Sequence, residues 1–242
     1  MLKALKNSVL SIVYPQECRV CGLAVENFTD GIACSDCWTS TRIFTGSEML
    51  CSKCGAFLNE SGLQIEVFCH KCDELSFDKA RAVGVYEKAL AAIALNLKRE
   101  PLIPERLHSK IHTAVLRYNF SDSTLIVSVP LSKKRRLERG FNQAEVIAEI
   151  ISKQSAIKID RESLVRTQHT PIHRVAMDKK AREITVKNAF EVTRPKLMAG
   201  QNVLLVDDIF TSGATASACA KILKKNGAAV VNVLTLARAV MR

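Results

Sequence analysis

The sequence lacks any apolar stretch long enough to cross a bilayer. Such a span needs about 20 consecutive apolar residues, and each apolar run in this chain is interrupted by polar residues well before that length. The N-terminal segment, residues 1–13, has two lysines and no small-residue cleavage site, which excludes a secretory signal. These absences predict a protein with no membrane span that stays in the cytoplasm.

Acidic residues are scarce relative to basic ones. The chain has 24 Asp and Glu against 35 Lys and Arg, so its formal net charge is +11. Such an excess favours polyanionic partners, either phosphorylated small molecules or nucleic acid. Five of the cations are concentrated in one short stretch: Lys133, Lys134, Arg135, Arg136 and Arg139.

Large apolar side chains are few in the first third of the chain, too few for a hydrophobic core without help. Cysteines supply the alternative, because eight of the nine form Cys-x-x-Cys pairs, each of which presents two thiolates to one ion. Two such pairs complete the tetrahedral S₄ site that suits zinc. The pairs are Cys18/Cys21, Cys34/Cys37, Cys51/Cys54 and Cys69/Cys72.

The similar gaps within successive pairs favour two zinc ribbons in tandem, with Cys18, Cys21, Cys34 and Cys37 in one site and Cys51, Cys54, Cys69 and Cys72 in the other. An interleaved arrangement, in which the first and third pairs share an ion, remains open. Each site has four protein ligands and no vacant position, so we expect structural rather than catalytic zinc. Metal binding would then contribute on the order of 10 kcal/mol per zinc to folding. Cys219 lies outside this pattern and is expected to pack as a small apolar residue.

The composition changes after Cys72, where strand-like and helix-like patterns begin to alternate. This alternation predicts an α/β fold with a mostly parallel sheet flanked by helices, and ligands at the carboxyl ends of its strands. We therefore divide the chain into a small zinc-ribbon domain, residues 1–77, and a larger domain, residues 78–242. Expected strands are 80–86, 125–129, 190–192, 203–206 and 230–236, and expected helices are 88–97, 107–118, 141–153 and 214–223.

Residues 203–215 carry the most informative motif: a short apolar strand, then Asp207 and Asp208, then a small, hydroxyl-rich turn that leads into a helix. A helix N-terminus following such a turn binds phosphate with its N–H groups and dipole. The two carboxylates would repel a phosphate, so they are expected to accept hydrogen bonds from a diol or to help hold a metal.

This motif resembles the phosphoribosyl-pyrophosphate (PRPP) signature of type I phosphoribosyltransferases. The resemblance implies that Asp207 and Asp208 bind the ribose hydroxyls and take part in catalysis, with Mg²⁺ accompanying PRPP. It also implies a 5′-phosphate cradle formed by Thr211, Ser212, Gly213, Ala214 and Thr215.

A second motif, residues 128–144, runs from a strand through a basic segment into a helix. Cations and loop amides there would stabilise a departing pyrophosphate. The expected pyrophosphate-binding residues are Ser132, Lys133, Lys134, Arg135 and Arg139. The stretch Val-Pro-Leu…Arg-Gly-Phe-Asn-Gln-Ala resembles the ComF family of competence-associated proteins, which joins an N-terminal Cys-x-x-Cys zinc region to a phosphoribosyltransferase-like domain. The resemblance covers nearly the whole chain.

Residues 166–190 resemble the flexible loop that closes over PRPP in such enzymes, with Lys179, Lys180 and Arg182 among its cations. The chain departs here from the family pattern, because His173, Arg174 and Thr185 stand where Gln and Asn are usual.

The resemblance implies a PRPP-binding protein that acts in natural transformation, with single-stranded DNA and DNA-uptake or recombination proteins as partners. Three readings stay open at this stage: a transferase acting on an unknown acceptor, a non-catalytic PRPP sensor or nucleic-acid scaffold, and a nucleotide-salvage phosphoribosyltransferase.

Overall fold

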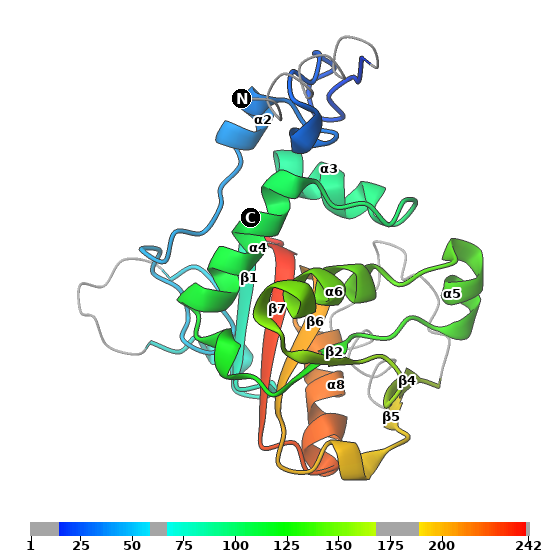
Figure 1. Cartoon of the computed structure of the whole chain (residues 1–242). Helices are drawn as coiled ribbons and strands as arrows, with labels where there is room; N and C mark the ends of the chain where they lie inside the picture. Colours follow the sequence, from blue (N-terminus) through cyan, green and yellow to red (C-terminus); the bar gives the residue numbers. More distant parts are fainter. Residues whose placement is uncertain (1–14, 59–66, 168–188, 241–242) are drawn as a thin grey trace, which may run out of the picture.

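The structure is a computed structural model that describes residues 15–58, 67–167 and 189–240 (Figure 1). Five parallel strands form its central sheet, in the spatial order β1-β7-β6-β2-β3. Their bounds are β1 Lys79–Val85, β2 Leu125–Ser128, β3 Lys158–Asp160, β6 Asn202–Phe210 and β7 Val230–Arg238. A separate antiparallel pair joins β4 Leu164–Arg166 to β5 Phe190–Val192. The predicted α/β fold with a mostly parallel sheet is confirmed.

Helices cover both faces of the sheet, and the alternation of apolar residues in β6 explains how. Leu204 and Val206 pack in one core with α3 Lys88–Asn96, α4 Glu105–Arg117 and α6 Gln143–Ser155. Val203 and Leu205 face the other side and pack in a second core with α8 Ala214–Lys225. A strand buried on both faces reads as a continuous apolar run, which is the pattern that predicted it.

The described residues also contain short α-helices and 3₁₀ turns. The short α-helices are α2 Ser35–Thr39 and α5 Lys133–Arg139, and α5 stands out from the sheet in Figure 1. The 3₁₀ turns are η1 Phe28–Asp30, η2 His70–Cys72, η3 Phe120–Asp122 and η4 Pro195–Leu197. No helix in the described ranges is both long and apolar enough to span a membrane.

The two cysteine-rich segments pack against different cores. Cys18, Cys34 and Trp38 belong to the core that contains α3 and α4. Cys51 and Cys72 belong to the core that contains α8. The sheet therefore supplies the apolar surface that these segments lack.

The linker between the two cysteine-rich segments crosses the outer edge of β1. Phe44 N donates to Val83 O at 2.9 Å, and Val85 N donates to Arg42 O at 2.9 Å. The approach is so close that a Cβ on Gly84 would lie 2.4 Å from Arg42 O. Only glycine fits at this position, because any side chain would clash with the linker and displace it from β1.

Candidate functional site

The eight paired cysteines form two separate clusters, and the order of pairing is sequential. Within each cluster the ligand atoms all lie within 4.8 Å of one another. Measured Sγ–Sγ distances are 3.6 Å for Cys21–Cys34, 3.6 Å for Cys51–Cys72 and 3.4 Å for Cys54–Cys69. A disulfide needs about 2.05 Å, whereas Zn–S bonds of about 2.3 Å in a tetrahedron place the sulfurs near 3.8 Å apart. The two clusters therefore fit two zinc ribbons, one holding residues 18–37 and the other residues 51–72.

Backbone N–H groups prepare one cysteine in each cluster to be a thiolate. Burial opposes ionisation of Cys18, but N–H donors led by that of Cys34 outweigh it and hold its pKa at about 6. Cys51 is held at a pKa of about 6 in the same way, with the N–H of Cys69 as the leading donor. Metal coordination requires the thiolate form, so one cysteine in each cluster is prepared for a metal, whereas burial raises the pKa values of Cys37, Cys54 and Cys72.

The second cluster also has cationic neighbours. Arg81 donates to Ser52 O at 3.0 Å, and Arg238 donates to Cys54 O. Burial lowers the pKa of both guanidinium groups, while the nearby cysteine sulfurs oppose that shift. A zinc ion with four thiolates carries a net charge of −2, and two adjacent arginines offset that charge.

Asp207 and Asp208 lie within β6, which is longer than the sequence predicted. The strand was expected to end at Val206, but β6 continues to Phe210 because β7 pairs with it as far as Arg238. Pairing with β2 does end at Val206. The two acids therefore stand beyond the end of β2, with Asp207 opposite Thr235 of β7.

The two carboxylates lie in a partly buried and crowded position. Burial raises the pKa of Asp207 well above its ordinary value of 3.8, and the charge of Asp208 raises it further, although the N–H of Asp208 donates to Asp207 Oδ1 at 2.9 Å. Two acids in this arrangement repel one another when both are ionised. A diol or a divalent cation bound between them would relieve that repulsion.

The predicted phosphate loop forms a tight turn at the N-terminus of α8. Gly213 is the N-cap residue with φ of +80°, and the first hydrogen bond of the helix joins Ser217 N to Gly213 O. Ser212 Oγ accepts from Ala214 N at 3.4 Å. The recess in this turn is about 30 Å³ and is lined by Asp207, Phe210, Thr211, Gly213, Ala214, Thr215 and Thr235, among others. That volume is about one water molecule, so a phosphate at this turn would lie over the loop, where Thr211 is exposed.

The basic segment, expected to be a loop, folds as helix α5. Ser132 is its N-cap and accepts from Arg135 N at 3.4 Å. Burial lowers the pKa of Arg135, and the adjacent Arg139 lowers it further. Lys133 and Lys134 face solvent. The predicted pyrophosphate residues are thus divided into a partly buried pair of arginines and an exposed pair of lysines.

Arg166, at the end of β4, interacts electrostatically with both Arg135 and Asp207. Burial lowers the pKa of Arg166, the charge of Arg135 lowers it further, and Asp207 acts in the opposite direction. Its guanidinium carbon lies 5.3 Å from the ring centre of Phe190 in the facing strand β5. From the sequence, Arg166 was expected to be a cation of the flexible loop, but it lies at the end of β4. The predicted loop residues Lys179, Lys180 and Arg182 fall outside the described residues.

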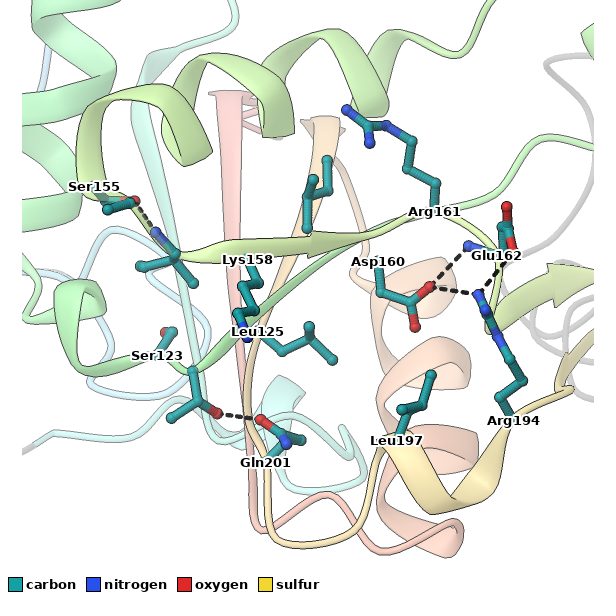
Figure 2. A pocket seen from close by; sticks show the side chains of 14 residues that line it. Ser123, Leu125, Ser155, Lys158, Asp160, Arg161, Glu162, Arg194, Leu197 and Gln201 are labelled. Carbon is teal, nitrogen blue, oxygen red and sulfur yellow. Dashed lines mark hydrogen bonds and ion pairs between the residues drawn. The ribbon is translucent and has the colours of Figure 1, made fainter.

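A larger hollow of about 890 Å³ lies beside β2 and β3, away from the acid pair (Figure 2). Three of its charged residues are paired with one another: Arg194 Nη2 lies 3.1 Å from both Asp160 Oδ1 and Glu162 Oε2. Thr124 Oγ1 donates to Gln201 Oε1 at 2.6 Å across its other end. This hollow could not be predicted from the sequence, because the residues that line it come from segments distant in the chain.

Fold and site together define a phosphoribosyltransferase-type domain that carries a double zinc ribbon. The double zinc ribbon domain family matches residues 9–73, and the phosphoribosyl transferase domain family matches residues 136–240. The glutamine PRPP amidotransferase of B. subtilis is a solved structure that covers 59% of this chain and 30% of its own, at 13% identity and a TM-score of 0.39.

Relatives of similar length align over both parts of this chain. The DNA utilization protein YhgH of Escherichia coli K12 is 30% identical over 240 residues, which cover 94% of this chain and 99% of the relative. Competence protein F of Haemophilus influenzae is 28% identical, covering 85% of this chain and 90% of that protein. Competence protein ComFC of Bacillus subtilis is 26% identical, covering 86% and 85%. The chain belongs to this ComF family, as its motifs predicted.

Proposed function

We propose that this chain binds PRPP at the junction of β6 and α8 and acts in the handling of DNA during natural transformation. The observation that supports this proposal is the position of Asp207 and Asp208 near the end of β6, two residues before the turn that leads into α8. The printed names of the relatives, DNA utilization protein and competence protein, support the cellular role. We place this activity in the cytoplasm, where reduced thiols can hold zinc.

Each part of the site has a role in this proposal. The acid pair accepts hydrogen bonds from the ribose hydroxyls, and the turn 211–215 holds the 5′-phosphate with backbone N–H groups and hydroxyls. Carboxylate oxygens also suit Mg²⁺, which would neutralise part of the charge on PRPP when bound. Residues 1–77 form the zinc unit that supports this domain in our scheme.

Transfer to an acceptor is a second candidate, favoured by a group of arginines of which Arg166 acts electrostatically on Asp207. Arg135, Arg139 and Arg166 are partly buried, and Arg135 is repelled by each of the other two, which favours binding of an anion such as a leaving pyrophosphate. Ser132, at the N-cap of α5, and the exposed Lys133 and Lys134 extend this surface. The loop cations Lys179, Lys180 and Arg182 are proposed to add to it.

Calorimetric titration with PRPP and Mg²⁺ tests the proposal. Wild type should bind, and the double variant Asp207→Asn/Asp208→Asn should not. Asp160→Asn serves as a control, because Asp160 belongs to the remote hollow of Figure 2. Equal heats of PRPP binding for all three proteins would contradict the proposed pocket. Release of pyrophosphate in the presence of bases or DNA then separates the transferase from the sensor.

A further inference from the structure

Arg238 connects the second cysteine cluster to the strand that carries the acid pair. It is the last residue of β7, and its guanidinium donates to the backbone carbonyl of Cys54. The same guanidinium lies over the ring of Phe210, 4.6 Å from the ring centre. Arg238 therefore contacts a metal-ligating residue and the end of β6 at once.

Phe210 in turn determines the space available to the phosphate turn. A Cβ built on Gly213 would lie 2.6 Å from Phe210 Cζ, so the turn is in contact with the ring. Phe77 holds the ring in an edge-on contact, with 5.8 Å between ring centres. The backbone is held as well, since Ala239 N donates to Phe210 O at 2.9 Å.

The segment that leaves the second ribbon reinforces this connection. Ser76 N donates to Ser217 Oγ, in the first turns of α8, at 3.0 Å. Asp78 pairs with Lys224 at 2.7 Å, near the other end of the same helix. The ribbon and the segment that leaves it, residues 76–78, thus contact α8, and Phe77 and Arg238 link them to the ring beneath the turn.

We propose that Arg238 is a positioning residue that couples the second cysteine cluster to the phosphate turn through Phe210. With all four cysteines on one metal ion, the 51–54 knuckle is fixed and presents the Cys54 carbonyl to Arg238. Loss of the metal frees the knuckle, Arg238 loses its acceptor, and the ring no longer holds the turn in its binding shape. The effect on PRPP rests on the proposed function, and the coupling to the turn does not.

Arg81, in β1, provides a matched control that anchors the same ribbon. It also donates to carbonyls of the knuckle, at 3.4 Å for Cys51 O and 3.0 Å for Ser52 O. Its guanidinium, however, lies over Tyr118, 5.5 Å from the ring centre, rather than over Phe210. An Arg81 variant therefore loses a ribbon anchor of the same kind without a change at the phosphate turn.

The test compares Arg238→Met, Arg81→Met, Phe210→Leu and the Arg238→Met/Phe210→Leu double variant, each with its zinc content measured. Arg238→Lys, which retains the charge, is the milder substitute should Arg238→Met fail to fold. Backbone amide exchange is recorded for residues 211–216, together with PRPP affinity. We expect faster exchange in the turn for Arg238→Met and Phe210→Leu, with two zinc ions retained and PRPP bound about fivefold to tenfold more weakly. The double variant should be little worse than either single variant.

Unchanged exchange in Arg238→Met, or an equal change in Arg81→Met, would overturn the coupling. Failure of the wild type to bind PRPP would overturn the proposed function alone, because faster exchange in the turn still reports the coupling. Partial removal of zinc from the wild type with a chelator should reproduce the Arg238→Met exchange pattern. An unchanged turn after loss of the second zinc would count against a metal-dependent link.

Discussion

Gly213 lies directly against Phe210: its φ is +80°, and a Cβ would come within 2.6 Å of the ring. Gly213→Ala should therefore lower the free energy of unfolding for two separate reasons. The left-handed backbone costs about 1–2 kcal/mol for a residue with a side chain, and the clash adds about 1–3 kcal/mol. Chemical denaturation measures the sum, and PRPP binding should be lost with it.

Gly200→Ala is the control for this prediction. Gly200 has a similar φ of +72° but no atoms within 4 Å of the built Cβ. It should lose only the backbone part of the stability and keep PRPP affinity. Equal losses in the two variants would mean that contact with Phe210 does not constrain the turn.

The raised pKa of Asp207 predicts a pH-dependent stability. Burial first, and Asp208 second, keep its folded pKa well above 3.8. Between these two pKa values the folded state binds more protons than the unfolded state, so the free energy of unfolding falls as pH rises. Asp207→Asn should remove this fall and be more stable than wild type at neutral pH. PRPP with Mg²⁺ favours the ionised acid, so its affinity should rise with pH over the same window.

Asp160→Asn should show the opposite sign. Burial opposes ionisation of Asp160, but hydrogen bonds led by those of Ser163 and Glu162 N, together with the charge of Arg194, lower its pKa below 3.8. Its contribution to stability is present above pH 3.8 and is lost as pH falls through the folded pKa. Thermal melting across the pH range measures both variants, and parallel curves for the two would refute the assignment of Asp207.

Metal analysis of reduced protein should find about two zinc ions per chain. Cys51→Ser should retain about one, because three ligands bind more weakly than four. Cys219→Ser should retain both, since Cys219 is buried against β6 and β7 and lies outside both clusters. A value near zero in wild type, or an equal loss in both variants, would contradict the ribbon assignment.

Binding of single-stranded DNA, if led by phosphate contacts, should weaken steeply with salt. Each phosphate contact to a single strand contributes about −0.7 to the slope of log K against log salt. Lys133→Ala/Lys134→Ala on α5 should therefore reduce the slope by about 1.4 when both contact DNA. Lys221→Ala/Lys225→Ala on α8 is the charge-matched control. Fluorescence anisotropy checks this, and a flat wild-type salt response would exclude a phosphate-led contact.

Much of the fold could be predicted from the sequence because its signals are local. The Cys-x-x-Cys spacing indicates the metal clusters, and the apolar run before Asp207 indicates a buried strand. The extension of β6 to Phe210 could not be predicted, because it depends on pairing with β7. Helix α5 was read as a loop because its charges hide any apolar face.

The part of the candidate site that lies in one continuous motif could also be predicted from the sequence. Asp207, Asp208 and the turn that follows form one continuous motif, so sequence alone indicates them. Arg238 and Phe210 were missed as a pair, although both lie near the ends of predicted strands. A partly buried arginine such as Arg238 has no signature in sequence, because its partners are a carbonyl and a ring from distant segments.

The linker that pairs with β1 has a consequence for assembly. With Arg42 and Phe44 occupying the outer side of that strand, no further strand from another chain can extend the sheet there. Growth by strand addition is left to the opposite border, where β3 spans only Lys158–Asp160 and offers few hydrogen-bonding groups. The linker between the two cysteine-rich segments thus blocks strand addition at the longer of the two edge strands, β1.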